Sequence, residues 1–183
     1  MTAQDLLWQV ALDQHGLITL SDARGLGISE DAVMMLAQRG KLERAATAVY
    51  RFPRFPAGPN EPYMLAVLWT GEPRACLSHD TALAAYDVSD INPGRVHLTV
   101  PRGRRIRRSG GDLYTVHHED LADDETGWWD EIPTVTLPTA IRQCIDSGVP
   151  TYLIRQALER APEAGRLAAA DAEALTARLD RRA

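Results

Sequence analysis

The first 52 residues alternate apolar and polar positions, at helical spacing first and at strand spacing afterwards. The predicted elements are a helix over residues 3–14, a short helix from Thr19 to Leu26, a helix from Ser29 to Arg39, and two strands, at Leu42 and over residues 48–52, with residues 43–47 around the tip. Thr19 and Ser29 are good helix N-caps, and Gly40 ends the third helix. Helix, short helix, helix and hairpin in this order predict a winged helix-turn-helix over residues 1–55.

Four prolines then interrupt regular structure between Pro53 and Pro62. Proline lacks the amide donor that a continuing helix or sheet needs, so residues 56–62 are expected to form a linker. We therefore expect a domain boundary here, with a second domain over residues 63–183.

The second domain mixes helical and alternating patterns. The predicted elements are helices over residues 63–69, 81–86, from Pro138 onward, 152–160 and 168–179, and strands over residues 96–100, 112–117 and 132–137. Residues 96–100 and 112–117 are interpreted as a hairpin around an arginine-rich turn. The predicted fold class is therefore α+β: an N-terminal winged helix-turn-helix followed by an α+β C-terminal domain with a small sheet and several helices.

Several short motifs follow the order found in one known family. They are Gly27-Ile28-Ser29, Arg39-Gly40-Lys41-Leu42-Glu43-Arg44 and Val49-Tyr50-Arg51, followed by Leu77-Ser78-His79-Asp80-Thr81-Ala82-Leu83 and Val96-His97-Leu98-Thr99-Val100-Pro101. On these residues the chain resembles AbiEi-type antitoxins of type IV toxin–antitoxin systems. It departs from their pattern at Ala48, where relatives usually have glycine, and at Ala140, Ile141 and Cys144, where many have arginine, threonine and aspartate.

The resemblance implies a transcriptional autorepressor that also neutralises a nucleotidyltransferase-fold toxin, with the antitoxin activity in the second domain. The expected partners are double-stranded operator DNA and that toxin, and the protein is expected to be a monomer or a weak dimer on DNA. The alternatives are a stand-alone repressor without a toxin partner and a nuclease-related enzyme. A nuclease would need a lysine near its carboxylates, and the only lysine, Lys41, lies in the other domain from the acidic run at residues 120–125.

Composition narrows the class of protein further. The 183-residue chain has a net charge of −5, two cysteines and no apolar stretch of the roughly 20 residues needed to cross a bilayer. Two cysteines are too few for a disulfide framework, and no leader of signal-peptide type is present. We therefore expect a cytoplasmic protein with reduced thiols.

Local charge favours DNA binding despite the acidic total. Basic side chains dominate residues 39–54, and five arginines lie between Arg102 and Arg108. Phosphate contacts depend on such local fields, and the planar arginine fork donates two parallel hydrogen bonds to phosphate. The candidate DNA-binding residues are Ser29, Met35, Gln38, Arg39, Lys41, Arg44, Arg51, Arg54, Arg102, Arg104, Arg105, Arg107 and Arg108. The alternatives for the last five are a solvated tip, an ion-pair partner for the acidic run, or a surface for a protein or RNA partner.

The helix from Ser29 to Arg39 is predicted to enter the major groove. Its apolar positions face inward at helical spacing, which leaves Met35 and Gln38 facing outward. Glutamine pairs with adenine, and an apolar side chain contacts the thymine methyl group. The alternative is that the methionines belong to the core or to a domain interface and that the acids of the first turn only complement the helix dipole.

No catalytic, metal or cofactor site is expected. Ser78, His79 and Asp80 carry the groups of a catalytic triad, but adjacent residues cannot converge on one reacting atom. The preferred interpretation is a helix cap at Ser78 or Asp80. His117 and its neighbours lack the spacing of zinc ligands, and Trp128-Trp129 is interpreted as core packing.

Overall fold

Contacts divide the chain into two units in the computed structural model, which describes residues 1–182. Unit 1 consists of Met1–Ala75, Arg104–Asp112 and Asp130–Ile132, and unit 2 consists of Cys76–Gly103, Leu113–Trp129 and the residues from Pro133 onward. Ala183, where the second predicted domain ends, lies outside the described residues. Helices and strands occur in both units, which confirms the α+β class. Within residues 1–182, every helix is too short or too polar to span a bilayer.

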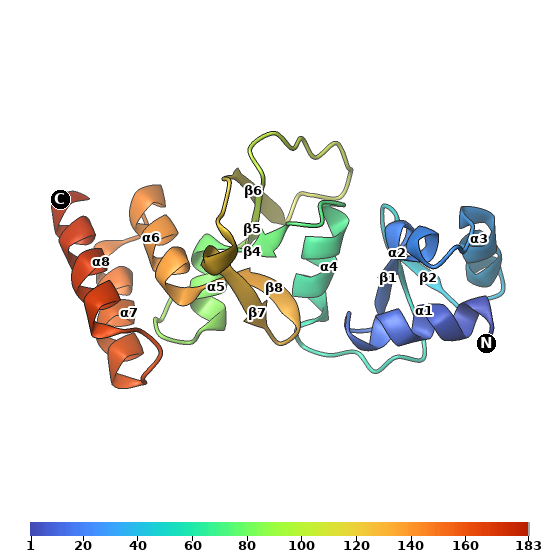
Figure 1. Ribbon diagram of the computed structural model, residues 1–183, viewed down its shortest axis with the longest axis horizontal. Helices are drawn as coiled ribbons and strands as arrows, with labels where there is room; N and C mark the ends of the chain where they lie inside the picture. Colours follow the sequence, from blue (N-terminus) through green and yellow to red (C-terminus); the bar gives the residue numbers. More distant parts are fainter. Residues whose placement is uncertain (183) are drawn as a thin grey trace. The chain divides into compact units, whose positions relative to one another are not determined.

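Unit 1 forms a winged helix-turn-helix (Figure 1). Its elements are α1 (Ala3–Leu12), β1 (Leu17–Thr19), α2 (Leu20–Gly25), α3 (Glu30–Gln38), β2 (Glu43–Ala46), β3 (Val49–Arg51) and α4 (Glu61–Trp69). The three strands form an antiparallel sheet in the order β1-β3-β2. Thr2 and Thr19 each close a capping box with the aspartate three residues later, which fixes where α1 and α2 begin.

The apolar faces predicted for these helices meet in one core. Val33 of α3 is fully buried in the same cluster as Leu7 of α1 and Ile18 of β1. Leu42 and Phe52 close this cluster at the base of β2 and β3. Burying one side chain of this size stabilises the fold by about 1.5–3 kcal/mol. The core therefore holds α3 firmly against α1 and the sheet.

The wing, formed by β2, β3 and the turn between them, differs from the prediction in two details. Strand β1 adds a third strand beside β3; its three residues are too few for alternation to reveal it. The tip is Thr47 and Ala48 rather than residues 43–47, because residues 43–46 form β2. Ala48 has a positive φ of 59°, the left-handed conformation that glycine adopts most easily.

Helix α4 contacts all three strands of this sheet, and the contacts group it with unit 1. The sequence had suggested instead that this helix begins the second domain. Arg51 of β3 connects the two elements, since its Nε donates to Glu61 Oε1 at 2.8 Å and its Nη2 donates to the Phe55 carbonyl at 2.8 Å. The proline-rich segment is thus a connection inside unit 1.

Among the described residues, unit 2 contains a five-stranded sheet and four α-helices. Helix α5 lies between two strands in the chain, and the other three helices follow the last strand. Its elements are β4 (Cys76–Leu77), α5 (His79–Ala85), β5 (Val96–Val100), β6 (Tyr114–His118), a 3-10 turn (Asp123–Glu125), β7 (Thr126–Trp129), β8 (Ile132–Val135), α6 (Leu137–Ser147), α7 (Thr151–Glu163) and α8 (Ala169–Arg182). The strand order is β6-β5-β4-β8-β7. Helix α5 contacts both β5 and α6, and α6, α7 and α8 lie side by side (Figure 1).

Strands β5 and β6 run parallel, with Thr99 opposite His117. The predicted hairpin is therefore wrong, because the strands of a hairpin are antiparallel. Parallel neighbours need a connection of a dozen residues or more, and residues 101–113 provide it. We call residues 101–113 the crossover segment. Its central part, Arg104–Asp112, belongs to unit 1 by its contacts.

The helices of unit 2 enclose their own apolar core. Ile141 and Cys144 of α6 are fully buried there, and Ala140 is buried in a second cluster beside β4. These are the three positions at which the sequence departs from the pattern of the family that it resembles, and each side chain packs in a core. Trp128 is 73% exposed, so the expected core packing is wrong for this residue.

Candidate nucleic-acid interface

The outward face of α3 carries the side chains that were expected to read bases. Met34 and Met35 are 51% and 48% exposed, so the alternative of core methionines is wrong. Gln38 is exposed one turn beyond Met35, on the same side of the helix. Ser29 caps the helix, because its Oγ accepts the Ala32 amide at 3.2 Å. The face therefore presents apolar atoms and one amide to solvent.

Four cationic side chains between the end of α3 and the residues after β3 are all exposed. They are Arg39, Lys41, Arg44 and Arg54. Within residues 1–182 none of them forms an ion pair or a side-chain hydrogen bond. By contrast, Arg24 of α2 forms an ion pair with Glu30 in the first turn of α3, with 3.0 Å between Nη2 and Oε1. Unpaired cations keep their field available for phosphates.

The Arg51 side chain is held by hydrogen bonds within unit 1. It is only 18% exposed, and its partner Glu61 is 17% exposed. The third donor group, Nη1, reaches the Phe52 carbonyl at 3.0 Å. The structure therefore places this residue, predicted to contact DNA, in an ion pair that joins β3 to α4.

Arg108 ties the crossover segment to the wing and to α4. Its Nη1 donates to the Trp69 carbonyl at 2.8 Å and lies 3.4 Å from the Thr47 carbonyl at the wing tip. Gly71 leaves room for the guanidinium, since a Cβ at that position would clash with it. Burial, together with the nearby Arg104, lowers the pKa of Arg108. Arg108 is thus an anchor.

Trp69 provides a second anchor for the same segment. Its Nε1 donates to the Ser109 carbonyl at 2.8 Å. Its ring lies so close to Gly111 that a Cβ there would be 2.8 Å from ring carbons. The two anchors fix residues 108–111 beside the wing tip and α4.

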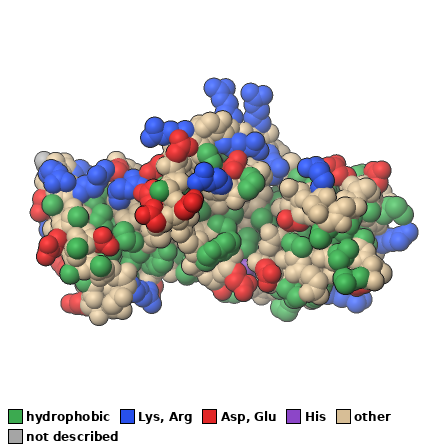
Figure 2. Space-filling view, in the orientation of Figure 1, with side chains coloured by type: hydrophobic (Ala, Val, Ile, Leu, Met, Phe, Trp, Pro, Cys, Tyr) green, Lys and Arg blue, Asp and Glu red, His purple; other side chains and the backbone are tan. Residues whose placement is uncertain are grey.

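The remaining arginines of the crossover segment differ in their surroundings. Arg105 and Arg107 are exposed and form no ion pair within residues 1–182. Arg104 lies 3.5 Å from Glu72 Oε2 through its Nε. Arg102 belongs to unit 2, where its amide donates to Asp120 Oδ1 at 3.0 Å. Figure 2 shows Lys and Arg side chains standing clear of the surface at the top of the view, over the crossover segment.

Comparison with known protein families matches residues 5–53 to the family described as "Transcriptional regulator, AbiEi antitoxin". The N-terminal segment is of the AbiEi type. The match runs from α1 to the end of the wing and confirms the resemblance seen in the sequence. No curated protein matches the chain. Among solved structures, the RV2827C protein from Mycobacterium tuberculosis is similar over 96% of this chain and 80% of its own, with a TM-score of 0.46 and 16% identity.

Outside the AbiEi-type segment, unit 2 holds three histidines in contact, which we call the imidazole cluster: His79, His97 and His117. The His79 and His117 rings stack with their centroids 3.5 Å apart, and His97 Nδ1 lies 3.0 Å from His117 Nε2. Ser78 is the N-cap residue of α5, as expected, but its Oγ makes no cap hydrogen bond and lies 2.9 Å from His79 Nδ1. The sequence did not predict this cluster, because the contacts of His79 in α5 with His97 in β5 and His117 in β6 depend on tertiary packing.

The surroundings keep the imidazole cluster neutral. Burial lowers the pKa of His79 to about 3, and His117, His97 and Arg142 add repulsion against its charged form. Burial also lowers the pKa values of His97 and His117. Within residues 1–182, no group of three or more His, Cys, Asp and Glu side chains is placed to hold a metal ion. The Ser78 hydroxyl is fully buried, which keeps it away from any substrate.

Proposed function

We propose that this protein is a DNA-binding transcriptional autorepressor that acts as the antitoxin of a type IV toxin–antitoxin system and carries no enzymatic activity. The observation that carries the DNA-binding part is the row of unpaired cations beside the exposed face of α3. Arg39, Lys41 and Arg44 suit phosphates, while Met35 and Gln38 suit base edges in the major groove. Double-stranded operator DNA is the proposed partner, and the cytoplasm is the proposed location.

The anchored crossover segment supports a larger DNA surface than the AbiEi-type segment alone. Arg108 lies beside Thr47, so the exposed Arg105 and Arg107 belong to the same unit as the wing tip. A winged helix-turn-helix places its wing along the DNA backbone once α3 is in the groove. Arginines fixed next to that wing are therefore suited to further phosphates.

The toxin-neutralising part of the proposal rests on the resemblance and the family match. We assign that role to unit 2 and a nucleotidyltransferase-fold toxin as its partner. A stand-alone repressor is the second candidate, favoured by the apolar side chains at the three departing positions of α6. Co-expression with the neighbouring toxin gene separates the two: rescue of growth supports the antitoxin, and unrelieved toxicity supports the stand-alone repressor.

A salt titration of DNA binding tests the regulatory part. If about four phosphates are contacted, log affinity for the upstream region falls with log salt concentration with a slope of about −4. Gln38→Ala should weaken the preferred site by roughly 1–3 kcal/mol and leave random DNA unaffected. A mobility-shift assay that finds no binding, or equal losses on both DNAs, rejects α3 as the reading helix.

A further inference from the structure

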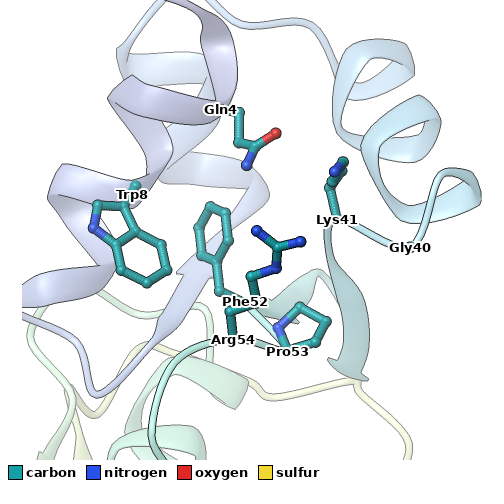
Figure 3. A pocket seen from close by; sticks show the side chains of 7 residues that line it. All are labelled: Gln4, Trp8, Gly40, Lys41, Phe52, Pro53 and Arg54. Atoms are coloured by element: carbon teal, nitrogen blue, oxygen red, sulfur yellow. The ribbon is translucent and has the colours of Figure 1, made fainter.

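We infer that a hollow at the base of the wing is a binding site for a single phosphate group. Its volume is about 80 Å³, and it opens between the first two turns of α1, the turn after α3 and the residues that follow β3. Figure 3 shows the Gln4, Lys41 and Arg54 side chains that line it, with the Phe52 ring between Trp8 and Arg54. The inference deepens the proposed DNA binding. It rests on that proposed function only where the phosphate belongs to the DNA backbone, and not where it belongs to a free molecule.

The charge of the hollow selects an anion. Two of its lining side chains, Lys41 and Arg54, are cations, and none of the lining residues is acidic. Within residues 1–182 neither cation forms an ion pair. The side-chain amide of Gln4 forms no hydrogen bond within the same residues. An arginine fork with an ammonium group beside it matches the several acceptor oxygens of phosphate better than a single carboxylate. The hollow thus offers donors that the fold itself does not use.

The walls of the hollow are rigid and apolar. Phe52 is 2% exposed and meets Trp8 edge-on, with ring centroids 5.1 Å apart at an interplanar angle of 82°. Pro53 fixes the backbone between Phe52 and Arg54. The hollow, of about 80 Å³, opens to solvent and suits a small anionic group such as one phosphate.

The phosphate has two possible sources, the DNA backbone and a free phosphorylated molecule. For the backbone, the operator is synthesised with one neutral methylphosphonate at each position in turn, and affinities are measured for the full-length protein, Lys41→Gln and Arg54→Gln. Arg24→Gln is the matched control, because it removes the same charge from an exposed arginine that lies away from the hollow and already pairs with Glu30.

If the DNA backbone is the source, the methylphosphonate that replaces the phosphate bound in the hollow should lower the affinity of the wild-type protein on the order of tenfold. The same position should cost Arg54→Gln almost nothing, because the contact is already lost. Arg24→Gln should behave like the wild type at every position. Thermal unfolding of each variant checks that the fold is intact.

For a free source, the probes are inorganic phosphate and a nucleoside 5′-monophosphate added to the protein without DNA. The readout is the NMR signal of the Trp8 indole N–H, assigned by its loss in Trp8→Phe. A saturable shift that disappears in Arg54→Gln and Lys41→Gln supports the site with a free ligand, even if the protein binds no operator. The inference is overturned if no methylphosphonate position couples to Arg54 and neither probe shifts the signal.

Discussion

Single residues show where the backbone is strained and which charged side chains are already held in ion pairs. Ala48 at the wing tip has a φ of 59°, and its carbonyl accepts the Leu20 amide at 3.0 Å. The hydrogen bond holds the turn in a conformation that costs an L-residue roughly 1–2 kcal/mol relative to glycine. The family that the sequence resembles usually has glycine at this position. The resemblance therefore indicated a special backbone conformation at Ala48, although it did not give the value of φ.

Ala48→Gly should therefore raise the free energy of unfolding by about 1 kcal/mol, because glycine adopts positive φ without the Cβ clash. Urea unfolding monitored by circular dichroism measures the change. Ala46→Gly is the control: Ala46 pairs with Val49 just past a register shift in β2 and has no positive φ, so glycine there should lower stability. If both substitutions lower stability equally, the tip is not strained.

Arg51 and Arg44 should separate structural from DNA-contacting charge. Arg51→Gln removes the partner of Glu61, whose Oε2 is buried without a hydrogen bond, and should destabilise the protein by about 1–3 kcal/mol. Its effect on the salt slope of DNA binding should be small. Arg44→Gln should leave stability within about 0.5 kcal/mol and flatten that slope by about one. Thermal unfolding and mobility shifts of the two variants form the test, and interchanged results would contradict the assignment.

At the scale of elements, the sequence predicted most of what local pattern determines. The order of helices and strands in the wing, the inward stripe of α3 and the last three helices follow from apolar spacing, caps and proline. Three strands of two, three and four residues, β4, β1 and β7, were missed because alternation needs more positions to be visible. The pairing of β5 with β6 was predicted with the wrong direction, since strand periodicity is the same in parallel and antiparallel pairs.

The candidate site was predicted in part for the same reason. Exposure of Met35 and Gln38 follows from their position on α3, and that of Arg39 and Lys41 from the turn after it. The structural contacts of Arg51 and Arg108 depend on partners 10 and 39 residues away, Glu61 and the Trp69 carbonyl. Their positions follow from tertiary packing, which one sequence does not reveal.

The crossover segment gives a prediction that belongs to an element. Arg105→Ser with Arg107→Ser should reduce operator affinity by about tenfold at low salt and leave the melting temperature unchanged, because both side chains are exposed and unpaired. Arg108→Ser is the comparison variant and should lower the melting temperature, since it removes the donor to the Trp69 carbonyl. Unchanged operator affinity in the double variant would place these arginines on another partner's surface.

The imidazole cluster predicts how the stability of unit 2 depends on pH. His79 has a pKa of about 3 in the fold and an ordinary value of 6.5 when unfolded, so below pH 6.5 the unfolded chain binds more protons. Stability is therefore fully present above pH 6.5 and is lost as pH falls toward 3. The carboxylates of Asp80 and Glu119 favour a charged His117, which limits the effect.

Between pH 7.5 and 5.5, the free energy of unfolding should drop by roughly 1 kcal/mol or more. His79→Asn should flatten this dependence, because asparagine tolerates the positive φ of 50° at that position and does not titrate. Urea unfolding at a series of pH values checks both proteins. A wild-type protein equally stable at the two pH values would show that the histidines are not held neutral.

At the scale of the whole molecule, unit 1 is assembled from three separate stretches of chain. Residues 1–75 contain the helices and the sheet, but Trp69 finds its acceptor on Ser109, and His15 Nε2 lies 2.8 Å from the Asp130 carbonyl. A DNA-binding unit that ends at the proline-rich segment would lack all of these contacts.

A fragment of residues 1–75 should consequently fold with lower stability than unit 1 has in the full chain, by about 1–3 kcal/mol for the lost hydrogen bonds and the uncovered Trp69 ring. Hydrogen exchange of the α4 amides, compared between fragment and full chain, measures this locally. Equal protection in both would show that the crossover segment adds nothing to the unit.

The distance along the chain between Trp69 and the crossover segment also sets an order of events during synthesis. The carbonyl that receives the indole N–H lies 40 residues downstream of Trp69. At about 5–20 residues per second, the ribosome needs roughly 2–8 seconds to add those residues. For that interval the nascent wing and α4 lack the crossover segment that contacts them, and β4 and β5 of unit 2 are synthesised before that segment is complete.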